Sequence, residues 1–329
     1  MGQARTVPPQ VQLENEPLSH LMRVLIASPE SRAVLNRIYR DLSWTEKASC
    51  YARWAKIFRG TDSYVESGTW SISFLEADLL LPLKSERIWL DWDSALSALG
   101  HESEIKQTYE ALLRRPYLPS LFVDVGANYG THSLLLLSQG VPVITIEPNV
   151  ECHSCFIESC SLNGFHPRLL ACCLGASDGE ATLWYPPLET WLGTTVLPTQ
   201  KKLIQRGYPL EETRVVQRTL DSLLGDINPT RILLKIDTEG SELSVFAGAE
   251  AVIDRHQPII IFESHKNESR TPLFHFLEKW KYSVFRLPWR EDRSETALCL
   301  REFLEAQECN FLARSNVGAF IWSTGDGLG

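Results

Sequence analysis

Two sets of residues in this 329-residue sequence have types and spacing suited to chemistry. In the first set, Gly126 and Gly130 follow a short apolar stretch and allow the backbone to turn sharply and approach a ligand. A helix that begins there would direct its N-terminal amides to the same place. Glu147 follows the next apolar stretch, twenty-one residues after Gly126. Because an acid at about that distance can accept hydrogen bonds from both hydroxyls of a ribose, the pattern predicts a nucleoside-binding site.

The second set consists of acids and one histidine that follow two later apolar stretches: Asp237, Glu239, Glu242, Glu263 and His265. So many acids at one place cannot all be ionised without a partner, so some of their pKa values should shift. Such a group can remove a proton from a hydroxyl as a general base. Alternatively, Asp237 with Glu263 or His265 could bind a hard divalent cation. No compact metal-binding motif is present, and we favour the base.

Some of these acids also have a purely structural interpretation. Glu239 and Glu242 could simply stabilise the N-terminus of the helix that they begin. Lys235 alternates with Asp237 along the same stretch, and a structural ion pair is its expected role.

The elements that must position these residues alternate between strand and helix. Apolar stretches predict strands at 121–125, 143–146, 168–174, 232–236, 259–262, 283–287, 311–313 and 319–322, with a hairpin arm at 180–184. Helices are expected from about residue 131, and at 150–163, 241–255 and 271–281. This alternation predicts an α/β fold with a doubly wound, mainly parallel sheet. In such a sheet ligands bind outside the carboxyl ends of the strands, where both sets of residues lie.

The composition excludes several classes of protein. Hydrophobic residues make up 44% of the chain and charged residues 22%, which is typical of a chain with a sizeable core. The net charge of −9 disfavours nucleic acid as a partner. No apolar run approaches the about 18 residues that would cross a bilayer. The first residues lack the apolar core of a secretory signal, so we expect a cytoplasmic protein whose eight cysteines are reduced thiols.

The glycine spacing also narrows the choice of nucleoside. A dinucleotide fold requires the pattern G-x-G-x-x-G, with a glycine close to the pyrophosphate. Here Asn128 and Thr131 occupy the second and third glycine positions. A ligand without a pyrophosphate fits better, and S-adenosylmethionine is such a ligand. An NAD-dependent oxidoreductase remains the alternative from another class, together with a non-catalytic nucleoside-binding module.

The sequence resembles the FkbM family of S-adenosylmethionine-dependent class I methyltransferases. The segments that carry the resemblance are 122–130 (FVDVGANYG), 146–149 (IEPN), 219–221 (TLD), 234–242 (LKIDTEGSE) and 262–263 (FE). They lie in the order of the family and span about residues 100–290. The resemblance implies a Rossmann-like, seven-stranded-type sheet. It does not extend to residues 1–95.

The resemblance also implies roles for individual residues. The methionine end of the cofactor would lie against Asp124, Gly126, Asn128, Gly130 and Thr131. Glu147 would hold the ribose, Pro148 and Asn149 would lie beside the adenine, and the loop that ends at Asp178 would contact it. The candidate catalytic residues are Asp237, Glu239, Glu263 and His265.

The function implied is methyl transfer from S-adenosylmethionine to a hydroxyl of a small molecule or sugar. N-methylation of a peptide or amide is the alternative within the class. The expected partner is a small-molecule or glycosidic acceptor, without nucleic acid or membrane. We expect a loose tail at 1–17, a mostly helical extension with a hairpin at 18–115, the methyltransferase domain at 116–322 and a frayed tail at 323–329. The extension would cap the domain or form the contact of a homodimer.

Overall fold

The structure, a computed structural model, describes residues 28–58, 68–83, 100–114, 118–187, 189–227, 231–266, 269–290 and 296–317. The chain divides into two compact units, which are considered separately below. The first comprises Met1–Lys106 and Glu158–Phe165, and the second comprises Gln107–Ile157 and His166–Gly329. The two tails and the strand predicted at 319–322 lie outside the described residues, and the domain boundaries drawn from the sequence stay a prediction.

The second unit is built on a seven-stranded sheet with the strand order β11-β12-β10-β9-β3-β4-β5. These strands are β3 (Leu121–Val125), β4 (Val143–Ile146), β5 (Arg168–Leu170), β9 (Ile232–Ile236), β10 (Ile259–Glu263), β11 (Tyr282–Arg286) and β12 (Asn310–Ser315). β12 runs antiparallel to β10 and β11, and the other neighbouring pairs are parallel. The predicted doubly wound, mainly parallel sheet is confirmed.

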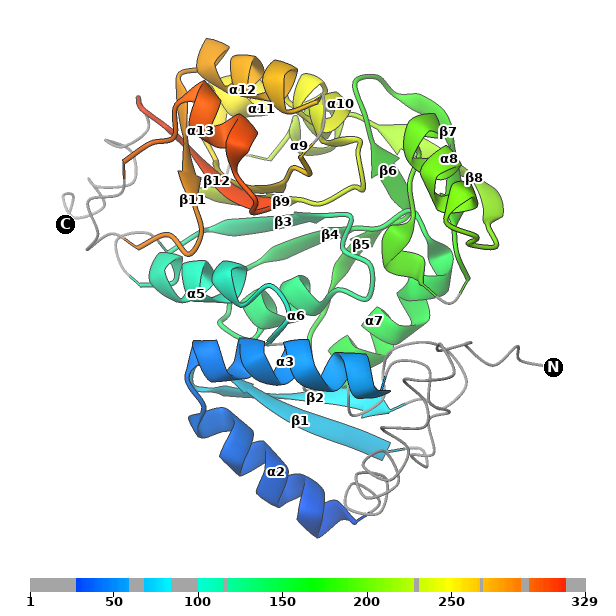
Figure 1. The fold of residues 1–329 in the computed structure, drawn as a ribbon, viewed down its shortest axis with the longest axis vertical. Coiled ribbons are helices and arrows are strands. Elements are labelled where there is room, and N and C mark those ends of the chain that lie inside the picture. Colours follow the sequence, from blue (N-terminus) through cyan, green and yellow to red (C-terminus); the bar gives the residue numbers. More distant parts are fainter. Residues whose placement is uncertain are drawn as a thin grey trace. The chain divides into compact units, whose positions relative to one another are not determined.

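Helices cover both faces of this sheet (Figure 1). One face carries α5 (Ser103–Leu112), α6 (Thr131–Leu137) and α7 (Val150–Leu162). The other carries α9 (Leu220–Leu224), α10 (Glu242–Ala247), α11 (Glu250–His256), α12 (Arg270–Lys279) and α13 (Leu300–Glu305). Because both faces are covered, β3 and β9 are buried along their whole length, and their sequences are almost continuously apolar. The polar exceptions, Asp124 and Lys235, therefore require a specific reason to be there.

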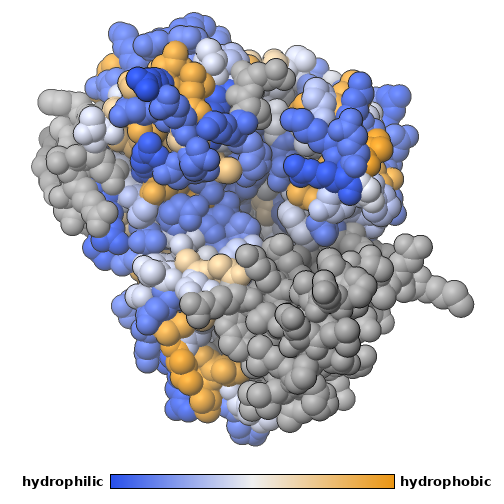
Figure 2. Space-filling model, in the orientation of Figure 1, coloured by the Kyte–Doolittle hydropathy of each residue, from blue (hydrophilic) through white to orange (hydrophobic). Residues whose placement is uncertain are grey.

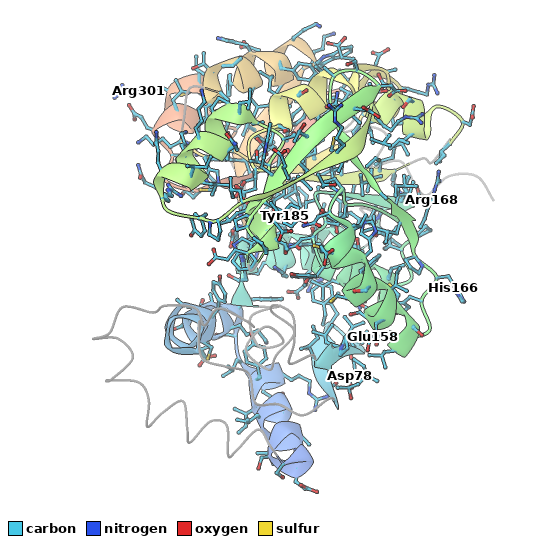
Figure 3. The ribbon with its side chains drawn as sticks, turned by 90° about the vertical axis from the view of Figure 1, so that its right-hand side faces the viewer. Asp78, Glu158, His166, Arg168, Tyr185 and Arg301 are labelled. Atoms are coloured by element: carbon cyan, nitrogen blue, oxygen red, sulfur yellow. The ribbon has the colours of Figure 1, made fainter. Side chains whose placement is uncertain are left out.

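The third predicted strand, 168–174, is divided between two sheets. β5 joins the large sheet, whereas β6 (Cys172–Leu174) pairs with β8 (Glu211–Arg218) in a three-stranded sheet of order β6-β8-β7. The expected hairpin arm is present as β7 (Gly179–Tyr185), which ends at Tyr185 (Figure 3). It pairs with β8 and not directly with β6, so the hairpin predicted there is wrong.

The helix predicted at 241–255 is likewise two helices. α10 and α11 are separated at Gly248, where a Cβ atom would collide with the carbonyl oxygen of Gly175. This close approach requires glycine and interrupts the helix. The 3₁₀ helix η1 (Thr190–Leu192), α8 (Leu197–Gln205), β8 and α13 had no counterpart among the predicted elements.

The first unit contains α2 (Pro29–Asp41), α3 (Trp44–Phe58) and the hairpin β1 (Gly68–Phe74) with β2 (Ala77–Leu83). Ser43 and Glu46 form a capping box at the start of α3, with Ser43 N donating to Glu46 Oε2 over 2.8 Å and Glu46 N donating to Ser43 Oγ over 3.3 Å. In the same unit, the amide of Asn163 pairs with the backbone of Leu80 in β2: Oδ1 accepts from its N–H and Nδ2 donates to its carbonyl. The side chain thereby continues the hairpin's hydrogen bonding as a further strand would.

The surface of the second unit is mainly hydrophilic on the face shown in Figure 2. Exposed apolar side chains lie on α8, at Leu197 and Ile204, and on β8, at Val216. None of the helices in the described part of the chain has both the length and the apolar composition needed to cross a membrane.

Candidate active site

The turn after β3 has the backbone conformation that its glycines predict. Gly126, Asn128 and Gly130 have φ angles of 76°, 50° and 72°. A Cβ atom at Gly126 would collide with the carbonyl oxygen of Asp237, and one at Gly130 would collide with the ring of Phe156. The glycine-rich turn therefore lies directly against the residue that follows β9, so the two predicted sets of residues adjoin.

Glu147 joins the turns that follow β3 and β4. Its Oε2 accepts a hydrogen bond from the N–H of Asn128, and its Oε1 accepts one from the N–H of Asn149, each over 2.7 Å. The side chain is 7% exposed, and burial raises the pKa of its carboxyl to about 7. The carboxylate is thus fixed in orientation at the place where the ribose was expected.

Two further buried side chains near this turn keep an unused polar atom. Asp124 accepts from Ser133 through Oδ2 over 2.7 Å, but its Oδ1 has no hydrogen-bond partner among the described residues. Asn149 accepts from the N–H of Glu151 through Oδ1, whereas its Nδ2, also buried, has no partner within the described chain. Because buried polar atoms are nearly always hydrogen-bonded, these two atoms are available to a polar ligand or to water. A nucleoside with an amino-acid tail has the donors and acceptors to fit them.

The side chain of Asn128 takes part in a network that the sequence did not reveal. Its Oδ1 accepts from Cys152 Sγ over 3.0 Å and from Thr190 Oγ1 over 3.1 Å. Thr190 Oγ1 also lies 2.8 Å from the hydroxyl of Tyr129. η1 is thereby attached to the glycine-rich turn. No sequence spacing relates Thr190 to position 128, so only the fold could reveal this contact.

Asp237 pairs with Lys235 across 2.8 Å, as the structural interpretation of Lys235 expected. The lysine side chain is 4% exposed and that of the aspartate 25%. A buried ammonium group needs a nearby counter-charge, and Asp237 supplies it. The carboxylate of Asp237, which follows β9, is therefore part of an ion pair.

Glu242 has a structural role in the loop that precedes α10, and its hydrogen bonds go to that loop instead of to the amides of the helix. Its Oε1 accepts from the N–H of Thr238 over 3.0 Å, from the hydroxyl of Thr238 over 2.9 Å and from the N–H of Gly240 over 3.0 Å. The carboxylate holds the loop between β9 and α10, in which Glu239 has a φ of 53°. A non-glycine residue rarely adopts this φ, so the loop positions the Glu239 side chain at some conformational cost.

Glu239, Glu263 and His265 converge on one point, as expected for residues at the ends of neighbouring parallel strands. His265 Nε2 lies 3.3 Å from Glu263 Oε2 and 3.9 Å from Glu239 Oε2. Each of the three side chains offers an atom within 4.8 Å of the others, so the group could also hold a metal ion. Burial raises the pKa of Glu263 to about 7, and the contact with Glu263 raises the pKa of His265.

The remaining predicted residues lie around this centre. Thr131 begins α6, and Pro148 lies in the turn after β4. Asp178 accepts from the N–H of Thr219 over 2.6 Å and from Ser222 Oγ over 3.0 Å, which ties the loop after β6 to the start of α9. These bonds lower the pKa of Asp178. Its contact with adenine stays a prediction, as do the roles assigned to the other residues.

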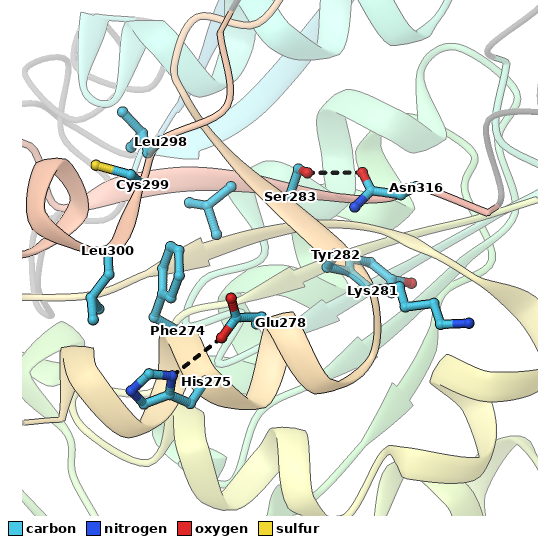
Figure 4. Close-up of a pocket in the computed structure, with 11 residues that line it drawn as sticks. Phe274, His275, Glu278, Lys281, Tyr282, Ser283, Leu298, Cys299, Leu300 and Asn316 are labelled. Carbon is cyan, nitrogen blue, oxygen red and sulfur yellow. Dashed lines mark hydrogen bonds and ion pairs between the residues drawn. The ribbon is translucent and has the colours of Figure 1, made fainter.

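A separate pocket of about 380 Å³ lies on the surface formed by α12, β11 and the segment before α13 (Figure 4). Its lining includes His275, Glu278, Lys281 and Asn316. Ser283 and Asn316 hydrogen-bond there over 2.8 Å. None of the predicted site residues lines this pocket, so it is distinct from the candidate active site.

The sequence matches the family model of the methyltransferase FkbM domain over residues 124–291, just over half of the chain. The chain belongs to this family. The strand order of its sheet and the family together confirm the class I methyltransferase fold that the resemblance implied. Membership of a family of S-adenosylmethionine-dependent methyltransferases also favours that class over an NAD-dependent oxidoreductase.

Several solved structures are similar to this FkbM-family chain. A methyltransferase FkbM from Methylobacillus flagellatus is 18% identical with a TM-score of 0.38, over 68% of this chain and 54% of its own. A ribosomal protein L11 methylase from Lactobacillus delbrueckii is 14% identical with a TM-score of 0.35, over 66% and 81%. The 16S rRNA N2 G1207 methyltransferase of T. thermophilus is 14% identical with a TM-score of 0.39, over 76% and 50%. The present chain thus spans about half of the Methylobacillus protein. No curated protein matches the sequence.

Proposed function

We propose that this chain transfers the methyl group of S-adenosylmethionine to a hydroxyl of a small molecule or sugar. The observation that carries the proposal is that the glycine-rich turn and the residue after β9 are in contact, at Gly126 and Asp237. A cofactor held by the turn would therefore lie beside the group formed by Glu239, Glu263 and His265. S-adenosylmethionine supplies an electrophilic methyl group on its sulfonium.

The turns after β3 and β4 would hold this cofactor. Glu147 is oriented by two backbone N–H groups, and each of its oxygens keeps a lone pair that can accept from a ribose hydroxyl. The unused Nδ2 of Asn149 can donate to a ring nitrogen of adenine. The unused Oδ1 of Asp124 can accept from a donor of the ligand or from a water molecule. These atoms match the donors and acceptors of the cofactor at the places that the family resemblance implies.

The carboxylates and histidine would remove the proton of the acceptor hydroxyl. A general base works best when its pKa is near the working pH, and burial raises the pKa of the Glu263 carboxyl to about 7. His265 lies against this carboxylate, so the pair takes up the proton as one unit. Asp237 is neutralised by Lys235 and is a weaker candidate for the base. Its role would be to fix the end of β9 beside the turn.

A matched pair of histidine variants tests this assignment. His265→Asn and Glu263→Gln should lower methyl transfer by ~10²–10⁴-fold, the range for losing a positioned base. His275→Asn is the control, because His275 is 56% exposed and contacts Glu278, much as His265 is 52% exposed and contacts Glu263. The assay would measure formation of S-adenosylhomocysteine with a panel of alcohols, phenols, glycosides, peptides and amides. Binding of S-adenosylhomocysteine, measured by calorimetry, should stay within twofold in all three variants.

Three results would contradict the proposal. Full turnover in both site variants would remove the pair from the reaction. Turnover only with peptides or amides would replace O-methylation by N-methylation. A parent protein that binds the cofactor but methylates none of these acceptors would favour a binding module.

The same assay distinguishes the base from a metal ion. Glu239 takes the place that Asp237 had in the metal alternative, because Asp237 is paired with Lys235. With a base, the rate should be unchanged after dialysis against a chelator. A rate that disappears on dialysis and returns with Mg²⁺ or Mn²⁺ would replace the base by a metal ion at Glu239, Glu263 and His265.

A further inference from the structure

A buried arginine lies behind the pair formed by Glu263 and His265. Arg270 is the first residue of α12 and is 1% exposed. Its guanidinium uses all five N–H groups on backbone carbonyl oxygens. Nε and Nη2 donate to Ser264 over 3.2 and 2.7 Å, Nη1 donates to Phe303 and Ala306 over 2.8 and 2.7 Å, and Nη2 donates to Glu308 over 2.6 Å.

These carbonyls belong to the two segments that surround His265. Ser264 lies between Glu263 and His265, and its N–H donates to the carbonyl of Cys309 over 2.7 Å. The thiol of Cys309 in turn lies 3.4 Å from Nδ1 of His265. One guanidinium therefore joins the peptide that carries both members of the pair to the segment against the other side of the imidazole.

Two aromatic rings lie close to this guanidinium. Its central carbon lies 5.3 Å from the ring centre of Phe303 and 5.2 Å from that of Phe311. A lysine at this position has three donors and no planar group, so it cannot make five hydrogen bonds. A buried cation bound only to carbonyl oxygens is costly to bury. What the site gains from the buried guanidinium is a fixed position for the peptide of Ser264.

We propose that Arg270 is a positioning residue, which holds the Ser264 peptide so that Glu263 and His265 stay in contact. This inference rests on the proposed function only for its effect on the rate. The contact itself is a property of the fold and can be measured without an acceptor. Glu263, Glu239 and Cys309 each place an atom within 4 Å of the His265 imidazole, and the charges of Glu242 and Asp237 also raise its pKa.

The experiment compares Arg270→Lys with Leu277→Ala in the full chain. Leu277 is a buried residue of the same helix, in the main core, so its truncation destabilises α12 without removing a bond to Ser264. We expect Arg270→Lys to lower kcat at least tenfold, with the KM for S-adenosylmethionine within twofold. The ¹⁵N shifts of the His265 imidazole should move toward those of a free histidine. Leu277→Ala should lower the melting temperature but leave kcat and the imidazole shifts unchanged.

A milder variant covers the case in which Arg270→Lys does not fold. Phe303→Leu keeps the guanidinium but removes one of the two rings beside it, and it should move kcat and the imidazole shifts in the same direction by less. Parent-like imidazole shifts in a folded Arg270→Lys protein, or in Phe303→Leu if the lysine variant is unfolded, would overturn the inference. Full turnover in His265→Asn together with shifted resonances in Arg270→Lys would overturn the proposed base but keep the role of Arg270.

Discussion

The protonation state of Glu147 affects the stability of the fold and the binding of the cofactor in opposite directions. As a buried acid its carboxyl has a pKa of about 7 in the fold, above the usual 4.5. The folded chain therefore holds this proton where the unfolded chain has lost it. Its contribution to stability is complete below pH 4.5 and is lost as the pH rises through 7, by about 3 kcal/mol in all. Binding of ribose hydroxyls needs the ionised form, which is the better acceptor.

We therefore predict that cofactor affinity rises with pH where stability falls. Between pH 6 and 8 the affinity for S-adenosylhomocysteine should increase roughly tenfold, since two hydrogen bonds gain about 1 kcal/mol or less each when the acceptor becomes charged. Calorimetry at the two pH values measures this change. Glu147→Gln, which cannot ionise, should bind more weakly and show no such rise. An equal affinity of the parent at both pH values would contradict the role of Glu147.

The ion pair of Lys235 and Asp237 gives a second prediction at this scale. Asp237→Asn is nearly isosteric, but it removes the carboxylate charge that lies 2.8 Å from the buried ammonium of Lys235. We expect it to lower the free energy of unfolding by ~1–3 kcal/mol, less than for a fully buried pair because Asp237 is 25% exposed. Urea unfolding of Lys235→Met, Asp237→Asn and the double variant measures the coupling. The double variant should lose less than the sum of the single losses, and strictly additive losses would show that the pair is not coupled.

At the scale of elements, the apolar stretches of the sequence predicted the strands of the large sheet and the residues at their ends. The alternation of strand and helix placed Asp237 and Glu263 at the ends of neighbouring parallel strands, and the structure confirms that placement. β8 was missed because its sequence is mostly charged and polar and it belongs to a small, half-exposed sheet. Its neighbour 168–174 was predicted as one strand because apolar composition does not show which sheet a residue joins.

Some contacts of the site depend on the fold alone. The bond between Thr190 and Asn128 joins residues far apart in the sequence, and neither belongs to a motif that names the other. An arginine at the start of a helix is usually exposed, and only the fold shows that Arg270 is buried with five hydrogen bonds to four carbonyl oxygens. The break at Gly248 was visible in principle as a glycine inside a helical pattern.

A prediction at the scale of elements concerns the close approach of the glycine-rich turn to the end of β9. Gly126→Ala would place a methyl group against the carbonyl oxygen of Asp237, in addition to the strain of its positive φ. Gly140→Ala is the matched control, because Gly140 has a φ of 74° but open space where its Cβ would be. We expect the control to lose about 1–2 kcal/mol of stability from strain alone. Gly126→Ala should lose more and should also abolish measurable binding of S-adenosylhomocysteine. Equal losses with intact binding would mean that the turn and β9 do not need this close approach.

At the scale of the whole molecule, the candidate site residues all belong to the second unit. The first unit contributes helices and a hairpin, and it also includes the last residues of α7. In these residues Asn163 bonds to the backbone of Leu80, and Cys160 is 1% exposed. The end of α7 is therefore structurally part of the extension, although its beginning follows the turn that carries Glu147.

This arrangement predicts that the extension cannot be removed without exposing the end of α7. Deletion of residues 1–99 leaves α5 whole but removes α2, α3 and the hairpin that pairs with Asn163. Burial raises the pKa of the Cys160 thiol to about 12, so in the full chain it should react with a thiol reagent far more slowly than the exposed Cys299. In the truncated chain we expect Cys160 to approach the labelling rate of Cys299, measured by peptide mapping, and the soluble yield to fall. Asn163→Ala in the full chain should show an intermediate rate. A truncated protein that is soluble, binds cofactor normally and still protects Cys160 would show that the second unit folds without the first.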